Sequence, residues 1–200
     1  MTENLETLRF AVIDVEGNGQ QPPEIVEIAI LAMDGLVLTT QPRTWLVKPS
    51  QPITPLVTRK VHGIKNSDVK DAPWFTEIAS EIQAILSDRI PVAHNARIDH
   101  EVLSRQLPTW EPALVVDTLR LARALWPGLK SYSLDPLLAH ARIDTSSLAG
   151  CRHRAGFDAH ATALLFATLA KLAVTRDQLL SLGCLPNRAP AAPPDEGVLF

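Results

Sequence analysis

RFAVIDVEG, residues 9–17, joins an apolar, β-branched run to two acids and a closing glycine. Short apolar runs bounded in this way are typical of buried strands. On a strand, Asp14 and Glu16 are two positions apart, so both side chains point to the same face. Two adjacent carboxylates at the end of a buried strand repel each other and are costly to desolvate, which favours a cation that neutralises them. The alternative is a solvated strand end, because the D-x-E pattern is common.

The sequence that follows this first strand predicts a mixed α/β sheet. Residues 24–35 alternate well enough for a second strand, with Asp34-Gly35 as a hairpin signal, and residues 36–49 supply a third strand. The sheet is therefore expected to begin as an antiparallel meander and to continue with strands that alternate with helices packed on it. Further strands are predicted at 90–94 and 112–117, and helices at 73–88, 96–107, 118–127, 133–141 and 156–174.

The composition fits one globular domain. The chain has 200 residues, 46% of them hydrophobic, and a formal net charge of -3, which indicates neither global disorder nor a strongly basic surface. Cys151 and Cys184 are the two cysteines and have no metal-ligand spacing. The N-terminus lacks the pattern of a signal peptide, and no apolar run approaches the ~20 residues of a membrane span. We expect a soluble, cytoplasmic protein.

The C-terminal residues differ in composition from the rest. We predict one folded domain over residues 1–183 and a flexible, proline-rich tail over residues 184–200. The tail ends in Val198, Leu199 and Phe200, which are either an end that is frayed or packed against the body, or a short peptide that binds a partner. These residues loosely resemble the Leu-Phe endings with which bacterial DNA-handling proteins bind the sliding clamp.

Two further acids stand early in predicted helices. VAHNARIDHEVL places Asp99 in the first turns after a strand, and GCRHRAGFDAHATALLF places Asp158 at a helix start with His153 on the preceding loop. Taken singly, an acid there can be stabilised by the helix dipole alone, and a loop histidine is usually solvated. The ends of strands and the starts of helices are also where α/β sheets place active sites.

Taken together, the four acids indicate a site for two metal ions. Four negative charges match two divalent cations, and oxygen-only ligands favour Mg²⁺ or Mn²⁺ over zinc. Two such ions ~3.5–4 Å apart can stabilise both the attacking and the departing oxygens in phosphodiester cleavage. The reaction also needs a base for the water, and histidine suits this role because its charge changes near neutral pH. His153 is the candidate.

Three motifs carry a family resemblance. DVEGNG, AHNARID and HRAGFD stand in the order, and at roughly the separations, of the three exonuclease motifs of the DEDDh 3′→5′ exonucleases. The resemblance covers about residues 9–174, and several connecting stretches, such as LARALWPGLKSYSL, resemble one member in particular. It implies the ribonuclease H-like fold. It also implies a general base at His153 and metal ligands at Asp14, Glu16, Asp99 and Asp158.

The resemblance further implies contacts to the last nucleotide. The family holds the terminal 3′-hydroxyl with the backbone after the first motif, here Gly17 and Asn18, and VHGI resembles a segment whose side chains touch the nucleotide, here His62 and Ile64. The alternative is that Ile64 belongs to the core and His62 to a loop. Gly17 stands where many members have threonine, and Ile98 where many have a phenylalanine that packs on a base, so substrate preference stays open.

We therefore expect a Mg²⁺-dependent exonuclease that releases nucleoside 5′-monophosphates from DNA 3′ ends, most readily single-stranded ones, in repair or end-trimming. RNA is the alternative substrate. A non-catalytic nucleic-acid-binding module is a further alternative, disfavoured because such a module does not need clustered carboxylates. Nearby basic residues would guide the phosphates of the strand or are solvated surface charges: Arg59, Lys60, Lys65, Arg152 and Arg154.

Overall fold

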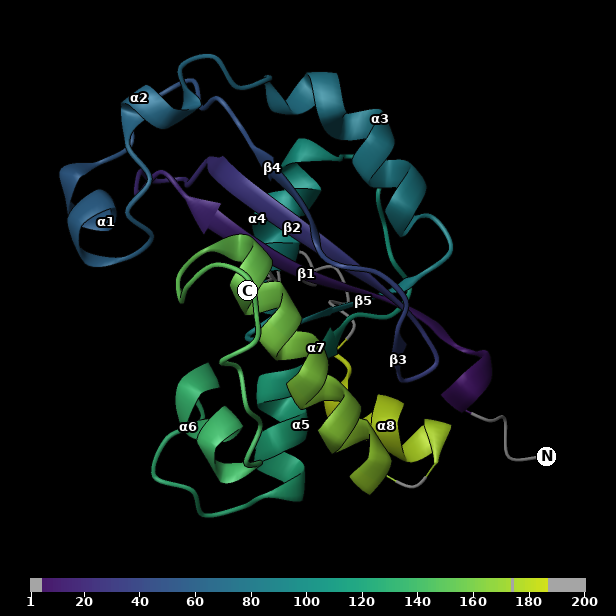
Figure 1. The fold of residues 1–200 in the computed structure, drawn as a ribbon. Coiled ribbons are helices and arrows are strands. Elements are labelled where there is room, and N and C mark those ends of the chain that lie inside the picture. The colour runs from purple at the N-terminus through teal and green to yellow at the C-terminus, as the bar shows by residue number, and fades with distance from the viewer. Residues whose placement is uncertain (1–4, 174, 187–200) are drawn as a thin grey trace, which may run out of the picture.

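A mixed β-sheet with helices on both faces forms the centre of the molecule (Figure 1), in a computed structural model that describes residues 5–173 and 175–186. The order of strands is β3-β2-β1-β5-β6, and β4 also pairs with β2. β1 runs antiparallel to β2 and parallel to β5, which is parallel to β6. The strands are β1 (Arg9–Gly17), β2 (Ile25–Asp34), β3 (Val37–Leu38), β4 (Arg43–Leu46), β5 (Ile90–Ala93) and β6 (Val116–Asp117).

The helices include long ones that the apolar periodicity predicted and short ones that it did not. Those predicted are α3 (Phe75–Leu86), α4 (Arg97–Gln106), α5 (Thr118–Leu125), α6 (Leu134–His140) and α7 (Ala155–Leu172). Those missed are the 3-10 turn η1 (Leu5–Thr7), α1 (Pro55–Lys60), α2 (Asn66–Val69) and α8 (Arg176–Gly183). η1 and α1 bury no residue, and α2 buries one, so the sequence there has no apolar stripe to detect.

The single strand predicted over residues 36–49 is two strands. β3 and β4 each pair with β2, and the residues between them include Pro42, which has no N–H to donate to a ladder. The hairpin at Asp34-Gly35 is present, and Gly35 takes a φ of 60° there. The antiparallel meander is thus correct in its pairing and wrong in its number of strands.

The two faces of β1 build two separate cores. Phe10 and Val12 pack with the helices α5 to α8, while Ala11 and Ile13 pack with α3 and α4. Figure 1 shows α7 lying across the first of these faces. Because side chains alternate along a strand, the next even-numbered positions after Val12 face α7. This places the two acids of β1 on the α7 side.

Three alanines set how closely α7 approaches the sheet. Ala29 of β2 packs against Ala155 and Ala159 in the first turns of α7, and all three are fully buried. The β1–β2 register puts Ala29 directly opposite Asp14. Small side chains at this contact let the start of α7 lie against the sheet, so that Asp158 comes beside the end of β1.

The packed body extends two residues beyond the predicted boundary at residue 183. Cys184 forms an antiparallel bridge with Val116, and the Leu185 N–H donates to the Val115 carbonyl at 2.8 Å. The C-terminal Val198, Leu199 and Phe200 lie outside the described residues, so the peptide predicted there stays a prediction. Among the described helices, none combines the length and apolar character that crossing a membrane requires.

Candidate active site

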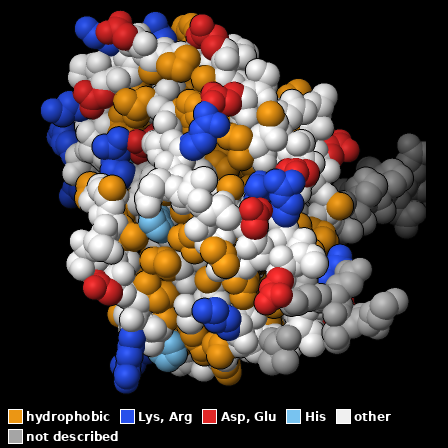
Figure 2. Space-filling view, turned by 45° about the vertical axis from the view of Figure 1, so that its right-hand side comes forward, with side chains coloured by type: hydrophobic (Ala, Val, Ile, Leu, Met, Phe, Trp, Pro, Cys, Tyr) orange, Lys and Arg blue, Asp and Glu red, His pale blue; other side chains and the backbone are white. Residues whose placement is uncertain are grey.

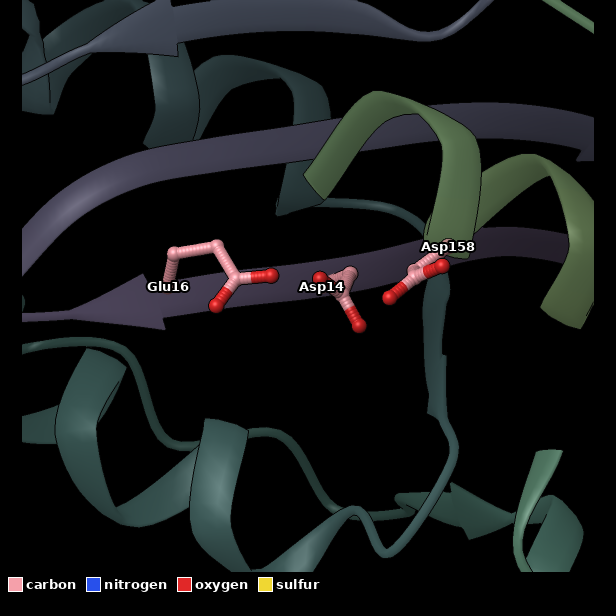
Figure 3. A group of neighbouring side chains, drawn as sticks. All are labelled: Asp14, Glu16 and Asp158. Carbon is pink, nitrogen blue, oxygen red and sulfur yellow. The ribbon is translucent and has the colours of Figure 1, made fainter. Parts of the chain in front are cut away.

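Three acids from distant parts of the sequence meet at the end of β1. Asp14 and Glu16 come from β1 and Asp158 from the first turns of α7, and one carboxylate oxygen of each lies within 4.8 Å of the other two. Figure 3 shows them in a row along the strand, with Asp14 between the other two in this view. The strand alternation and the alanine contact under α7 together account for this meeting.

Asp99, the fourth predicted acid, lies beside this trio rather than in it. It projects from the first turn of α4, is 9% exposed, and one of its carboxylate oxygens accepts a hydrogen bond from the Val15 N–H at 3.1 Å. The bond ties α4 to the backbone between Asp14 and Glu16. Asp99 is close enough to raise the pKa of Asp14 through charge repulsion.

Burial and mutual repulsion raise the pKa of these carboxyl groups. Burial is the largest cause for every one of them. It raises the pKa of Glu16 to about 8, with repulsion from Asp158 next, and the pKa of Asp99 to about 7. The pKa of Asp14 is raised by burial and by its acidic neighbours, although its side chain keeps some exposed surface. A set of oxygen ligands that is costly to ionise alone fits divalent cations such as Mg²⁺ or Mn²⁺.

Arg152 supplies a positive charge of the protein's own. Its guanidinium forms ion pairs with Asp158 and with Asp135 of α6. Burial raises the pKa of the Asp158 carboxyl, and the bond from Arg152 opposes this rise. The sequence suggested that Arg152 and Arg154 either guide phosphates or are solvated. In the structure, Arg152 is paired with two acids and Arg154 with Glu27 of β2, and a role in guiding phosphates stays a prediction.

His153 sits on the loop before α7 with an exposed side chain. Its backbone has a φ of 61°, in the left-handed region that residues other than glycine rarely adopt. Its N–H donates to the second carboxylate oxygen of Asp158 at 3.1 Å. The backbone of His153 is therefore bonded to a member of the acidic trio, and its ring faces solvent beside it.

The residues predicted to contact a nucleotide form hydrogen bonds within the protein. Asn18 is fully buried, its side-chain oxygen accepts from the N–H groups of Gln20 and Glu24, and its own N–H donates to the Glu24 carbonyl. His62 is 5% exposed and its Nε2 lies 3.1 Å from the Gly17 carbonyl oxygen. Burial lowers the pKa of His62.

Ile64 lies in a small core cluster, which is the alternative that the sequence left open for it. Its N–H donates to Nδ1 of His62 at 3.0 Å. His62 therefore links the VHGI segment to the end of β1 through Gly17. The segment shapes the backbone next to the acids, whether or not its side chains touch a ligand.

A pocket of about 380 Å³ opens beside the acids. Its lining residues include Asp14, Asp158 and Arg152, and also Arg123 and Tyr132. The guanidinium of Arg123 lies 5.6 Å from the centre of the Tyr132 ring. The pocket offers carboxylates, cations and an aromatic ring within one hollow, which sequence reasoning did not foresee because its walls come from β1, α5, α6 and α7.

The exonuclease family model (RNase_T) matches residues 11–166, which contain every acid described above. The chain belongs to this exonuclease family. The resemblance to DEDDh-type exonucleases is thereby confirmed. A cluster of acidic residues compatible with metal binding accompanies the match.

Similar proteins support the same family and fold. The chain is 32% identical over 153 residues to DNA polymerase III subunit epsilon of Rickettsia conorii, covering 71% of this chain and 66% of that protein. It is 35% identical over 156 residues to exodeoxyribonuclease 10 of Escherichia coli, covering 77% of this chain and 65% of that protein. The chain thus spans just under two thirds of each relative.

A solved structure, exonuclease X in complex with 5′ overhanging duplex DNA, has a TM-score of 0.72 and 31% identity, covering 88% of this chain and 98% of that one. This likeness confirms the predicted ribonuclease H-like fold, with its antiparallel meander followed by parallel strands. Exonuclease X is also the member that several connecting stretches of the sequence resemble.

Proposed function

We propose that this exonuclease removes nucleotides one at a time from DNA 3′ ends and releases nucleoside 5′-monophosphates. The observation that carries the proposal is the meeting of Asp14, Glu16 and Asp158 within 4.8 Å in a chain of the exonuclease family. DNA is proposed as the substrate because the similar proteins include exodeoxyribonuclease 10, a DNA polymerase subunit and exonuclease X bound to DNA. A cytoplasmic location belongs to the same proposal.

The acids are proposed to hold two Mg²⁺ ions, for which Mn²⁺ can substitute. Asp14, Glu16 and Asp158 would be direct ligands, and Asp99 would complete the site from its position beside β1. Metal ions bound there would supply positive charge to the attacking and departing oxygens of the phosphodiester. The raised pKa values of these acids support the proposal, because a cation offsets the cost of ionising them.

His153 is proposed as the general base. Its exposed ring can reach solvent, and a histidine can take a proton from water at neutral pH. The bond from its N–H to Asp158 ties the position of the base to a proposed metal ligand. The water would lose its proton to the His153 ring as its oxygen attacks the phosphorus. The bond to the 3′-oxygen of the preceding nucleotide would break, and that oxygen would take up a proton from solvent.

The terminal nucleotide is proposed to lie in the pocket that Asp14 and Asp158 line together with Tyr132 and Arg123. An aromatic ring there can stack on a base, which contributes ~1–3 kcal/mol. The backbone at Gly17 and Asn18 would shape the neighbouring wall, held in place by His62. Direct contacts from His62 and Ile64 to the last nucleotide stay part of the proposal, made through the small part of each side chain that is exposed.

The test is degradation of DNA and RNA oligonucleotides of the same sequence, each labelled at its 5′ end. With Mg²⁺ or Mn²⁺ we expect a ladder of shortened DNA products, none with EDTA, and none with Asp14→Ala. A ladder on RNA alone would transfer the proposal to an exoribonuclease. Intact substrates of both kinds under all metal conditions would contradict the proposal and favour a binding module. Adding a sliding clamp to the same reaction tests the partner proposed for the C-terminal residues.

A further inference from the structure

Glu27 is a buried acid next to the trio that is not part of it. It lies on β2 directly opposite Glu16 in the β1–β2 register, so both side chains project from the same face. Its side chain is 2% exposed, and its charge contributes to raising the pKa of Glu16. A buried carboxylate must be compensated, and the contacts of Glu27 identify how.

Both carboxylate oxygens of Glu27 accept hydrogen bonds from the two residues that follow His153. One oxygen accepts from Nε of Arg154 at 3.0 Å and from the Ala155 N–H at 2.8 Å, and the other accepts from the terminal nitrogen of the same guanidinium. This is a two-pronged, charge-assisted contact that fixes geometry as well as charge. Glu27 could act as a metal ligand only by giving up these bonds.

The partners of Glu27 stand at the point where the loop becomes α7. Arg154 is the residue before the helix, and its side chain makes no capping bond to the helix. The Ala155 N–H is one of the N–H groups that a helix leaves without a partner at its start, and Glu27 supplies the acceptor together with a negative charge. A carboxylate on β2 thus replaces the missing local cap.

His153 immediately precedes the two residues that Glu27 binds, and its own backbone is held by a second contact. Its N–H is bonded to Asp158, and its φ of 61° is a conformation that the surrounding structure has to enforce. Two carboxylates therefore hold this strained residue in place: Asp158 binds its N–H, and Glu27 binds the two residues that follow it.

We infer that Glu27 and Arg154 are positioning residues that fix the His153 loop against β2. The inference rests on the proposed function, in which the His153 ring accepts the proton of the attacking water. A base displaced by about 1 Å can cost on the order of 10²-fold in rate without any change in the metal ligands. Glu27 would then act on turnover through His153 alone.

The deciding variant is Glu27→Gln, which keeps the size of the side chain and an acceptor for Ala155 but removes the charge that holds Arg154. We expect kcat to fall by about 10–100-fold, with KM and the Mn²⁺ Kd little changed. In a His153→Ala background, the same substitution is expected to change kcat little, because the group it positions is gone. Arg154→Lys keeps the positive charge but cannot donate two parallel hydrogen bonds to the carboxylate. It is also expected to lower kcat.

Glu81→Gln is the matched control. Glu81 is also a glutamate paired with an arginine, Arg43, but it lies on α3 and is half exposed. It should leave kcat unchanged in both backgrounds. An equal loss of kcat from Glu27→Gln with and without His153, or a parallel loss of Mn²⁺ affinity, would overturn the inference, since Glu27 would then support the whole site.

A second measurement does not depend on turnover. Amide hydrogen exchange at residues 153–155 reports the order of the loop directly. We expect faster exchange there in Glu27→Gln, with the middle of α7 unchanged. Unaltered exchange at these residues would overturn the inference even in an active enzyme. A wild-type protein that cleaves no substrate would refute the proposed function, while the exchange result would still decide whether Glu27 orders the loop.

Discussion

His153 has the arrangement of a base that can be removed without disturbing the acids. Its ring is exposed, and its contact with the site is made by its backbone N–H, which any residue provides. We predict that His153→Ala lowers kcat by roughly 10²–10⁴-fold, the usual contribution of a general base. Folding and Mn²⁺ binding should be close to those of the wild type. Steady-state kinetics and calorimetry measure the two effects.

His140→Ala is the matched control for this substitution. His140 is likewise exposed, at the last residue of α6, and its ring contacts Trp126 instead of an acid. It should retain the wild-type kcat. If the turnover of His153→Ala equalled that of the control, His153 would have no part in the chemistry, and another acceptor for the proton would be needed.

Individual side chains differ in how much the sequence revealed about them. Asp14 and Glu16 could be placed together because strand alternation is a local rule. Glu27 was passed over because one polar residue in an alternating strand is typical of a solvent-facing position, and the register with β1 decides otherwise. Asn18 could not be assigned to internal hydrogen bonds, since its partners depend on the turn that brings Glu24 back to it.

At the scale of elements, the contact between β2 and α7 sets the distance between Asp14 and Asp158. Ala29, Ala155 and Ala159 are fully buried there, so no space remains for larger side chains. We predict that Ala29→Val costs about 1–3 kcal/mol of stability, because overpacking forces the helix away from the strand. The same displacement should weaken Mn²⁺ binding. Urea unfolding and calorimetry test both effects.

Ala32→Val controls for the properties of valine in a strand. Ala32 lies on the same strand at an odd separation from Ala29, so it projects from the opposite face, and it is only half-buried. Valine suits strands in general, and we expect little change in stability or Mn²⁺ affinity there. Equal effects from the two substitutions would show that β2, and not its contact with α7, is sensitive to added volume.

The long elements were predictable from the sequence because each buries a repeating apolar face. α3 buries Phe75, Ile78 and Ile82 at helical spacing, and the sheet order follows from strands that alternate with such helices. α1 buries nothing, and its place is set by tertiary bonds such as that from the Thr54 N–H to the Asn18 carbonyl. The local apolar pattern of a sequence cannot predict such bonds between distant residues.

For the whole molecule, the net charge is small, and acidic side chains gather at the site. The net charge is -3, and on the face in Figure 2 basic and acidic side chains are interspersed among apolar ones. That face offers no continuous basic stripe to a nucleic acid. Attraction of a polyanion is then expected to depend on cations bound by the acids, which reverse the local charge.

The acids should also make the stability of the whole protein depend on pH and metal. The folded-state pKa of Glu16 is about 8 and that of Asp99 about 7, both above their ordinary values of 4.5 and 3.8. The folded protein therefore binds more protons than the unfolded chain between these limits, and stability falls as pH rises through them. Because each pKa unit corresponds to ~1.4 kcal/mol, the fall is on the order of a few kcal/mol for each of the two groups.

We predict that, without metal, the melting temperature declines from pH 5 to pH 8, and that millimolar Mg²⁺ or Mn²⁺ restores it most strongly at pH 8. Ions that bind the folded state alone stabilise it in proportion to the logarithm of their concentration. Asp14→Ala should flatten the decline, because it removes one repelling charge, and should abolish the rescue by metal. Thermal unfolding at several pH values, with metal or EDTA, measures both. A metal-free protein that gains stability toward pH 8 would show that these acids ionise at no cost, and the physical reason for a cation between them would be lost.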